Sequence, residues 1–148
     1  MIIKKQLLQI CNERVDKRIN DYKEEINLIK DAISNNDKSN DLDDDSGNGK
    51  LLNDLEKNLV HLNDAQQTKT HLQLVKTGII NNDVILGSLV KTNLMNFYIS
   101  TSIGKIDLEN ESYFAISLSS PIGQLLKNKK VNDQFEFNQS KYIIKEII

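Results

Sequence analysis

The residues whose type and spacing most directly suggest chemistry form an acidic run at positions 37–45. Five of the chain's 21 acidic residues lie in these nine positions, and Lys38 is the only basic residue among them. Carboxylates held this close repel one another, and a divalent cation relieves the repulsion. Mg²⁺ takes oxygen ligands, commonly one or two carboxylates with waters and the groups of a partner. The acidic run is therefore either a solvated turn or part of a magnesium site that another molecule completes.

A calcium-binding EF-hand loop does not fit this run. Such a loop needs Glu at its twelfth position, and only a loop that starts at Asp45 would have one, at Glu56. Gly47 and Gly49 would then fill the third and fifth positions, where they offer no side-chain oxygen. The spacing excludes this class of calcium site.

Other polar residues give no sign of catalysis. His61 and His71 are ten residues apart and have no Cys or His at ligand spacing, so we interpret them as surface or seam-flanking residues. The single cysteine, Cys11, excludes a disulfide framework and a Cys-based zinc site, and we expect it to pack as a small hydrophobe. There is no glycine-rich phosphate loop and no recognisable nucleophile motif. We predict no catalytic residue of the chain's own.

A basic group lies near the start of the chain. Its members are Lys4, Lys5, Arg14, Lys17 and Arg18. This group either contacts a phosphate backbone or forms a charged helix face interleaved with Glu13 and Asp16. The net charge of −2 gives no overall attraction to nucleic acid. Charge is nevertheless polarised, since residues 31–45 carry six acidic residues and one basic residue.

Two segments of helical periodicity flank the acidic run and must position it. In the first, over residues 3–35, the apolar seam is Leu8, Cys11, Val15, Ile19, Tyr22, Ile26, Ile29 and Ile33. In the second, over residues 50–76, it is Leu52, Leu55, Leu59, Leu62, Ala65, Leu72 and Val75. Alternating steps of three and four residues are typical of a coiled coil. We predict an antiparallel hairpin over residues 1–77 with the acidic run at its tip.

The pattern changes after Gly78. Short apolar and β-branched runs at 84–90, 97–100, 113–118, 134–137 and 142–148 predict about five strands, with turn-rich pieces such as 102–110 between them. Ser120 as N-cap and Pro121 at the first position predict a short helix. Residues 78–148 therefore read as a small α+β domain. No apolar run is long enough to span a membrane and the start lacks a signal-peptide pattern, so we expect a cytoplasmic protein with no membrane partner.

Three C-terminal stretches carry a family resemblance. Residues 119–126 hold a Ser-Pro before a short apolar helix, residues 130–133 form a Lys-to-Asp turn, and residues 142–147 form a closing strand. Together they resemble the end of the bacterial Gre transcript cleavage factors, GreA and GreB. The resemblance extends to the order of the parts. It implies an α+β fold class in which an N-terminal antiparallel α-helical coiled-coil hairpin precedes a small FKBP-like domain.

The resemblance also implies a function, that of a transcription elongation factor. In the family the C-terminal domain binds RNA polymerase, here through Ser120, Pro121 and Ile122, and the hairpin enters the secondary channel. Tip carboxylates help to hold a Mg²⁺ shared with the polymerase active site, and the polymerase then cleaves backtracked RNA. The factor stimulates this endonuclease activity and is not itself an enzyme.

Individual positions match the family's tip motif, Gly-Asp-Leu-x-Glu-Asn. Asp41 matches the first acid and Asp44 stands in place of the Glu, with Asp43 and Asp45 as reserve metal ligands. The basic group would face the 3′ end of the nascent RNA. Asp44 is one methylene shorter than the family's Glu, and Asn132 replaces a Gly in the C-terminal turn, where Asn also accepts a positive φ.

Three other functions stay open. A Gre-like protein that enters the channel without cleavage would be a regulator or inhibitor of RNA polymerase. A coiled-coil adaptor for another protein would show no polymerase among its partners. Prolyl isomerase activity is the fourth reading, although only 5% of the residues are aromatic and could line a proline pocket.

Overall fold

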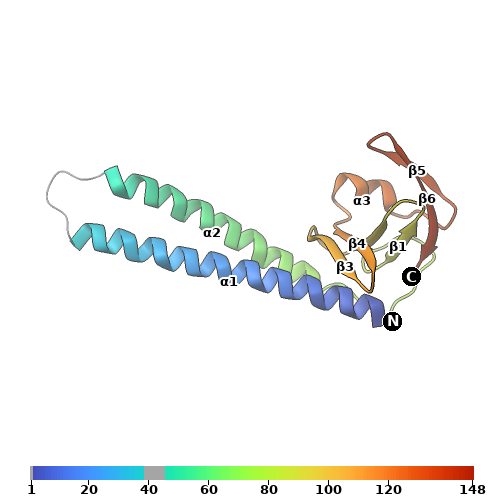
Figure 1. Cartoon of the computed structure of the whole chain (residues 1–148), viewed down its shortest axis with the longest axis horizontal. Helices are drawn as coiled ribbons and strands as arrows, with labels where there is room; N and C mark the ends of the chain where they lie inside the picture. Colours follow the sequence, from blue (N-terminus) through green and yellow to red (C-terminus); the bar gives the residue numbers. More distant parts are fainter. Residues whose placement is uncertain (1, 39–45) are drawn as a thin grey trace. The chain divides into compact units, whose positions relative to one another are not determined.

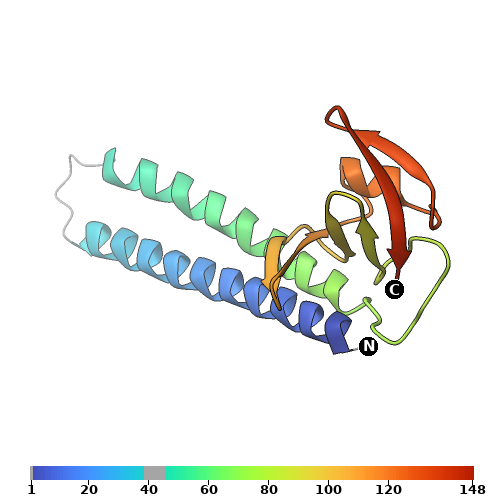
Figure 2. The ribbon, with the colours of Figure 1, turned by 45° about the vertical axis from the view of Figure 1, so that its right-hand side comes forward.

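Two long helices begin the chain. The structure, a computed structural model, describes residues 2–38 and 46–148. Helix α1 spans Ile2–Lys38 and α2 spans Ser46–Leu72. Figures 1 and 2 show the two helices side by side and antiparallel, which confirms the predicted hairpin. Helix α2 begins and ends four residues earlier than the predicted range of 50–76.

The described residues form two units. The part of the hairpin from Val15 to Lys69 is one unit, which we call the hairpin unit. The start of α1 up to Arg14 groups with residues 70–148, and we call this the sheet unit. The division differs from the predicted domains, 1–77 and 78–148, because the first turns of α1 pack with the sheet.

Within the hairpin unit, α1 presents the predicted seam. Val15, Ile26 and Ile29 are buried, and Ile19, Tyr22 and Ile33 are half-buried. On α2 the less exposed residues at steps of three and four are Leu51, Leu55, Asn58, Leu62 and Ala65, which we take as the inward set; Asp54 beside them is also half-buried. The predicted seam residues Leu52 and Leu59 are instead 53% and 46% exposed, so their assignment is wrong. The rest of the predicted seam is confirmed, since Leu55 and Leu62 are half-buried and Ala65, Leu72 and Val75 are buried.

Side-chain contacts across the hairpin set its register. The rings of Tyr22 and His61 stack with centroids 5.5 Å apart and an interplanar angle of 24°. An ion pair joins Asp16 to Lys69. Nearer the turn, the Asn48 amide donates to the carboxylate of Asp37 at 2.8 Å. His61 thus flanks the seam, as expected for a histidine with no ligand partners.

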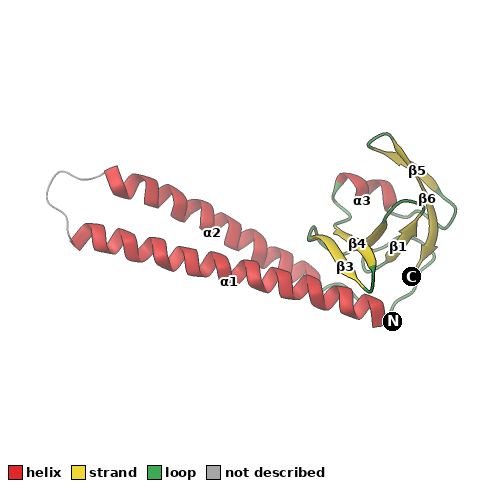
Figure 3. Cartoon of the chain, in the orientation of Figure 1, coloured by secondary structure: helices red, strands yellow, loops and turns green. Residues whose placement is uncertain are grey.

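The sheet unit contains six strands and one short helix (Figure 3). These are β1 (Leu89–Thr92), β2 (Asn96–Ile99), β3 (Gly104–Leu108), β4 (Glu111–Ile116), α3 (Pro121–Leu126), β5 (Gln134–Phe137) and β6 (Ser140–Ile147). The strand order is β3-β4-β2-β1-β6-β5, and only the β2–β4 pair is parallel. A helical hairpin followed by a small mixed sheet with one helix confirms the α+β class.

Strand β3 is the one that the sequence pattern misses. It lies within the predicted turn region 102–110 and pairs antiparallel with β4. Glu109 and Asn110 connect the two strands with positive φ values of 52° and 67°. Because β3 is an edge strand, only Ile106 is buried while Lys105 and Asp107 are exposed. A single buried residue gives too weak an apolar signal for a strand.

The apolar core of the sheet unit gathers residues from most of its elements. Its buried members are Val84, Val90, Phe97, Ile99, Leu126, Phe135, Tyr142 and Ile144. The Phe135 and Tyr142 rings stack with their centroids 4.9 Å apart, and the centroid of the Tyr142 ring also lies 6.0 Å from that of Phe97. Leu126 brings α3 into this core, so the position of the short helix is fixed by apolar packing.

Candidate functional site

The start of α3 has the geometry expected from its Ser-Pro sequence. Ser120 is the N-cap, and its Oγ accepts a hydrogen bond from Gly123 N at 3.1 Å. The same hydroxyl donates to the Ser117 carbonyl at 2.7 Å. Pro121 follows at the first helical position, where the missing N–H costs nothing. The predicted cap is confirmed, and the hydroxyl of Ser120 joins α3 to the end of the preceding turn.

Gly123 lets this turn and α3 approach closely. A Cβ placed on Gly123 would lie 2.0 Å from the Ser117 carbonyl oxygen and 2.9 Å from the Leu118 Cα. Both are backbone atoms, so no side-chain rotation could relieve the clash. The Ser-Pro-x-Gly sequence is therefore a structural requirement of this turn as well as a motif.

The predicted docking residues differ in accessibility. Pro121 is exposed, Ser120 is half-buried and occupied as a cap, and Ile122 is half-buried against the core. Two further residues, Gln124 and Leu125, are exposed on α3. They follow Pro121 by three and four residues, the spacing that puts side chains on one helix face. This spacing could have identified them from the sequence.

The turn at residues 130–133 closes on itself. Lys130 N donates to the Asp133 carboxylate at 2.8 Å, and Asp133 N donates to the Lys130 carbonyl at 3.0 Å. Asn132 has a φ of 75° and donates through its N–H to the Ile144 carbonyl at 2.8 Å. The expectation that Asn132 accepts the positive φ of a glycine is confirmed. The turn thereby attaches to β6.

The predicted metal ligands Asp41 and Asp44, with the reserves Asp43 and Asp45, lie outside the described residues. Within the described ranges, no group of three or more His, Cys, Asp or Glu side chains is placed to hold a metal ion. The magnesium assignment therefore stays a prediction from the sequence.

The structure corrects the basic group at Lys4. The Lys4 side chain is 0% exposed, and its Nζ donates to the main-chain carbonyls of Ile79 at 2.9 Å and Ile148 at 3.1 Å. Figure 2 shows the first turn of α1 beside the end of β6. The ammonium group of Lys4 is buried and donates hydrogen bonds to both carbonyls. Lys4 therefore cannot face RNA in this structure. It fastens α1 to two distant parts of the sheet unit.

The other four basic residues remain exposed. Arg14 Nη1 donates to the Lys105 carbonyl at 2.6 Å, and Lys17 pairs with Asp21 at 2.9 Å one helical turn away. The hydrogen bond that Lys17 donates to the Asp21 carboxylate raises the pKa of Lys17. Lys5 and Arg18 are exposed on α1. For these four residues both interpretations from the sequence still apply, an RNA-facing group or a charged helix face.

Cys11 packs as expected for a small hydrophobe. It is buried, and its Sγ lies 4.0 Å from Ser100 Oγ in the sheet unit. Burial raises the pKa of the thiol, which keeps it protonated. The burial of the thiol agrees with its predicted role as a packing group.

Replacing Lys4 with methionine is expected to destabilise the sheet unit by about 1–3 kcal/mol, because two carbonyls lose a charged donor. Burial lowers the pKa of Lys4, so the unfolded chain binds this proton more tightly than the folded chain. The contribution of this ionisation to stability therefore grows as the pH rises through the folded-state pKa. The buried Tyr98 and Tyr113 have raised pKa values, so their ionisation opposes this rise at alkaline pH. The unfolding free energy of the wild type minus that of Lys4→Met, measured with urea, should therefore grow between neutral and alkaline pH.

Lys5→Met is the matched control, because Lys5 is the exposed neighbour of Lys4. It should leave the unfolding free energy close to that of the wild type at both pH values. Equal effects of the two substitutions would contradict the role given to the buried ammonium group.

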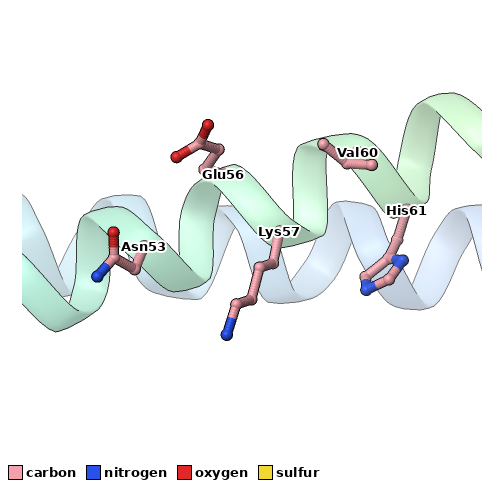
Figure 4. A pocket seen from close by; sticks show the side chains of 5 residues that line it. All are labelled: Asn53, Glu56, Lys57, Val60 and His61. Carbon is pink, nitrogen blue, oxygen red and sulfur yellow. The ribbon is translucent and has the colours of Figure 1, made fainter.

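A shallow groove of about 350 Å³ lies on the outer side of α2. Figure 4 shows the side chains that line it, which are Asn53, Glu56, Lys57, Val60 and His61. Glu56 points away from Lys57 and His61 (Figure 4), so the three ionisable groups do not converge. Proton transfer needs an acid and a base within hydrogen-bond reach of one substrate atom. The groove therefore lacks the arrangement of a catalytic site.

No helix in the described part of the chain has the length and apolar character needed to cross a membrane.

Among known proteins, the chain shows similarity to solved structures. No family model matches the chain, and no curated protein matches it. It is similar to a structure of the transcription factor Gfh1, with a TM-score of 0.41, 16% identity, and coverage of 93% of this chain and 92% of that one. It is also similar to Gfh1, GreA factor homolog 1, of Thermus thermophilus, with a TM-score of 0.35, 17% identity and coverage of 93% and 94%. For Gfh1 of Thermus aquaticus the TM-score is 0.34, the identity 20%, and the coverage 94% of each chain.

Proposed function

We propose that this chain is a Gre-like transcription factor that binds RNA polymerase and stimulates the cleavage of backtracked transcripts. The hairpin would enter the secondary channel of the polymerase, and the sheet unit would bind at its rim. The observation that carries the proposal is the place of the acidic run, which connects two long antiparallel helices. A helix of 27 residues, the length of α2, extends for about 40 Å at ~1.5 Å per residue.

The geometry of α3 supports the same proposal. The Ser-Pro that helps to carry the resemblance lies in one tight turn, in which Ser120 caps α3, Pro121 begins it and Gly123 allows the close approach of the chain. That turn leaves Pro121, Gln124 and Leu125 exposed. A small exposed face with one proline and one leucine suits docking to another protein, where aliphatic anchors seat in pockets of the partner.

Asp41 and Asp44 would serve as metal ligands in this function. A second Mg²⁺ in the polymerase active site stabilises both the attacking and the leaving oxygen of an in-line displacement. The chain's own part would be to supply carboxylate oxygens from the end of a hairpin. Such a site has few ligands of its own, so the chain alone should bind Mg²⁺ weakly.

A second function, a channel-binding regulator that does not stimulate cleavage, is favoured by one observation. Asp44 stands where the Gre motif has Glu, and its carboxylate is one methylene closer to the main chain. With shorter reach it would fail to complete the metal site while still occupying the channel. The two functions share the partner and differ in the reaction.

The test of both is a pair of assays with purified RNA polymerase. The full chain should co-purify with the polymerase, and it should shorten the transcripts of stalled, backtracked complexes in the presence of Mg²⁺. Binding with no change in transcript length would establish the second function. Absence of binding would overturn both and leave the adaptor interpretation.

Leu125→Glu is expected to weaken polymerase binding at least about tenfold, since a charge on an apolar anchor costs on the order of 2 kcal/mol. Leu125 is 36% exposed, so the fold should tolerate the change. Leu94→Glu is the matched control, because Leu94 is 55% exposed on the turn between β1 and β2. Equal binding by the two variants in a titration with polymerase would contradict docking through α3.

A further inference from the structure

At two places on α2, either of two adjacent residues could face α1. Leu51 and Leu52 compete for one position, and one heptad later Asn58 and Leu59 compete for the other. Leu51 and Asn58 are half-buried, whereas Leu52 and Leu59 are exposed at 53% and 46%. An amide thus occupies a place in the seam that a neighbouring leucine could take.

Asn58 gains no partner from α1 in this place. Its Nδ2 donates to the Asp54 carbonyl at 2.9 Å, four residues earlier in its own helix. Apolar burial would be greater if Leu59 faced α1 instead. The four leucines at positions 52, 55, 59 and 62 are spaced by three, four and three residues, which is an uninterrupted coiled-coil seam.

A modest rotation separates the two arrangements. Successive residues of an α-helix differ by ~100° around the axis, and Leu55 and Leu62 belong to both seams, so a turn of about 50° suffices. Ala65 is buried, whereas a further step of four from Leu59 and Leu62 would lead to the exposed Gln66, so the rotation is limited to the part of α2 before Ala65.

One contact opposes the rotation on the side of α2 that would move away from α1. His61 stacks on Tyr22 across the hairpin. Figure 4 shows Glu56 and His61 pointing to different sides of α2, so a rotation that withdraws His61 brings Glu56 closer to α1. The described arrangement thus keeps an aromatic pair, and in the seam it holds Asn58 where the other arrangement would hold a second leucine.

We propose that residues 51–62 of α2 have two packing states against α1. In the described state Leu51 and Asn58 face α1 and the Tyr22–His61 stack is made. In the other state Leu52 and Leu59 replace them and the stack is broken. The Tyr22–His61 stack is thereby coupled to the orientation of the first half of α2. This proposal does not depend on the proposed function.

Thiol reactivity distinguishes the two states. Asp54 is half-buried and Glu56 is exposed, and neither belongs to either seam, so Asp54→Cys and Glu56→Cys, made separately, report the rotation without altering the leucines. The native Cys11 is fully buried and serves as an unreactive reference. Adding His61→Ala should lower the reactivity at position 56 and raise it at position 54, with a shift in the ratio of states of about 2- to 12-fold, the value of one aromatic pair.

Two further variants make the test specific. His61→Phe keeps a ring against Tyr22 and should restore the original reactivities. Asn58→Leu makes the described seam fully apolar and should abolish the response to His61→Ala. Increased reactivity at both positions would indicate that the helices separate, and unchanged reactivity would indicate one packing state. Either outcome overturns the proposal.

Discussion

Gly123→Ala should destabilise the sheet unit by lowering its unfolding free energy by about 3 kcal/mol. The added Cβ would meet the Ser117 carbonyl oxygen at 2.0 Å, far inside van der Waals contact. That carbonyl cannot withdraw freely, because it accepts the hydrogen bond of the Ser120 hydroxyl. Relief of the clash therefore requires loss of the cap or movement of Leu126 in the core.

Urea unfolding followed by near-ultraviolet circular dichroism measures this effect in the right part of the molecule. Three of the four tyrosines, Tyr98, Tyr113 and Tyr142, lie in the sheet unit and are buried. Gly78→Ala is the matched control, since a Cβ on Gly78 meets nothing within 4 Å. If Gly123→Ala unfolded at the same urea concentration as Gly78→Ala, the close approach of the turn to α3 would be wrong.

Asp41→Ala combined with Asp44→Ala should reduce the stimulated rate of transcript cleavage by on the order of 100-fold, the usual cost of removing a group that stabilises transition-state charge. Binding to polymerase should persist, because docking is proposed for α3. Asp43→Ala and Asp45→Ala, as reserve ligands, should cost less. Cleavage of stalled complexes and polymerase binding are measured on the same preparations.

The matched control removes the same charge from the helices of the hairpin. Asp31 and Asp64 are exposed on α1 and α2, so Asp31→Ala with Asp64→Ala tests for a general effect of charge. Asp44→Glu restores the length of the family's side chain and should raise cleavage if reach limits it. Unchanged cleavage in the Asp41/Asp44 double variant would end the metal assignment.

Features that depend on local chemistry could be predicted from the sequence. Ser120 and Pro121 specify a helix start through one hydroxyl and one ring, whatever surrounds them. The two helices followed from apolar steps of three and four over many turns.

Features that depend on distant partners could not be predicted. Leu51 and Leu52 are the same residue type, so periodicity cannot choose between them without the contacts of His61 and Lys69. Lys4 looks like any surface lysine, because the carbonyls that bury it come from Ile79 and Ile148. Strand β3 carries one buried residue and depends on β4 for its pairing.

The hydrogen bond from Arg14 to Lys105 has a consequence for association between copies of the chain. Strand β3 is at the edge of the sheet, and open edge strands invite pairing with a strand of another molecule. Arg14 occupies the Lys105 carbonyl, and the exposed charges of Lys105 and Asp107 lie on the same strand. The start of α1 thus hinders the pairing of β3 with a strand of another molecule. Removing the N-terminal residues up to Arg14 would expose the Lys105 carbonyl and favour aggregation.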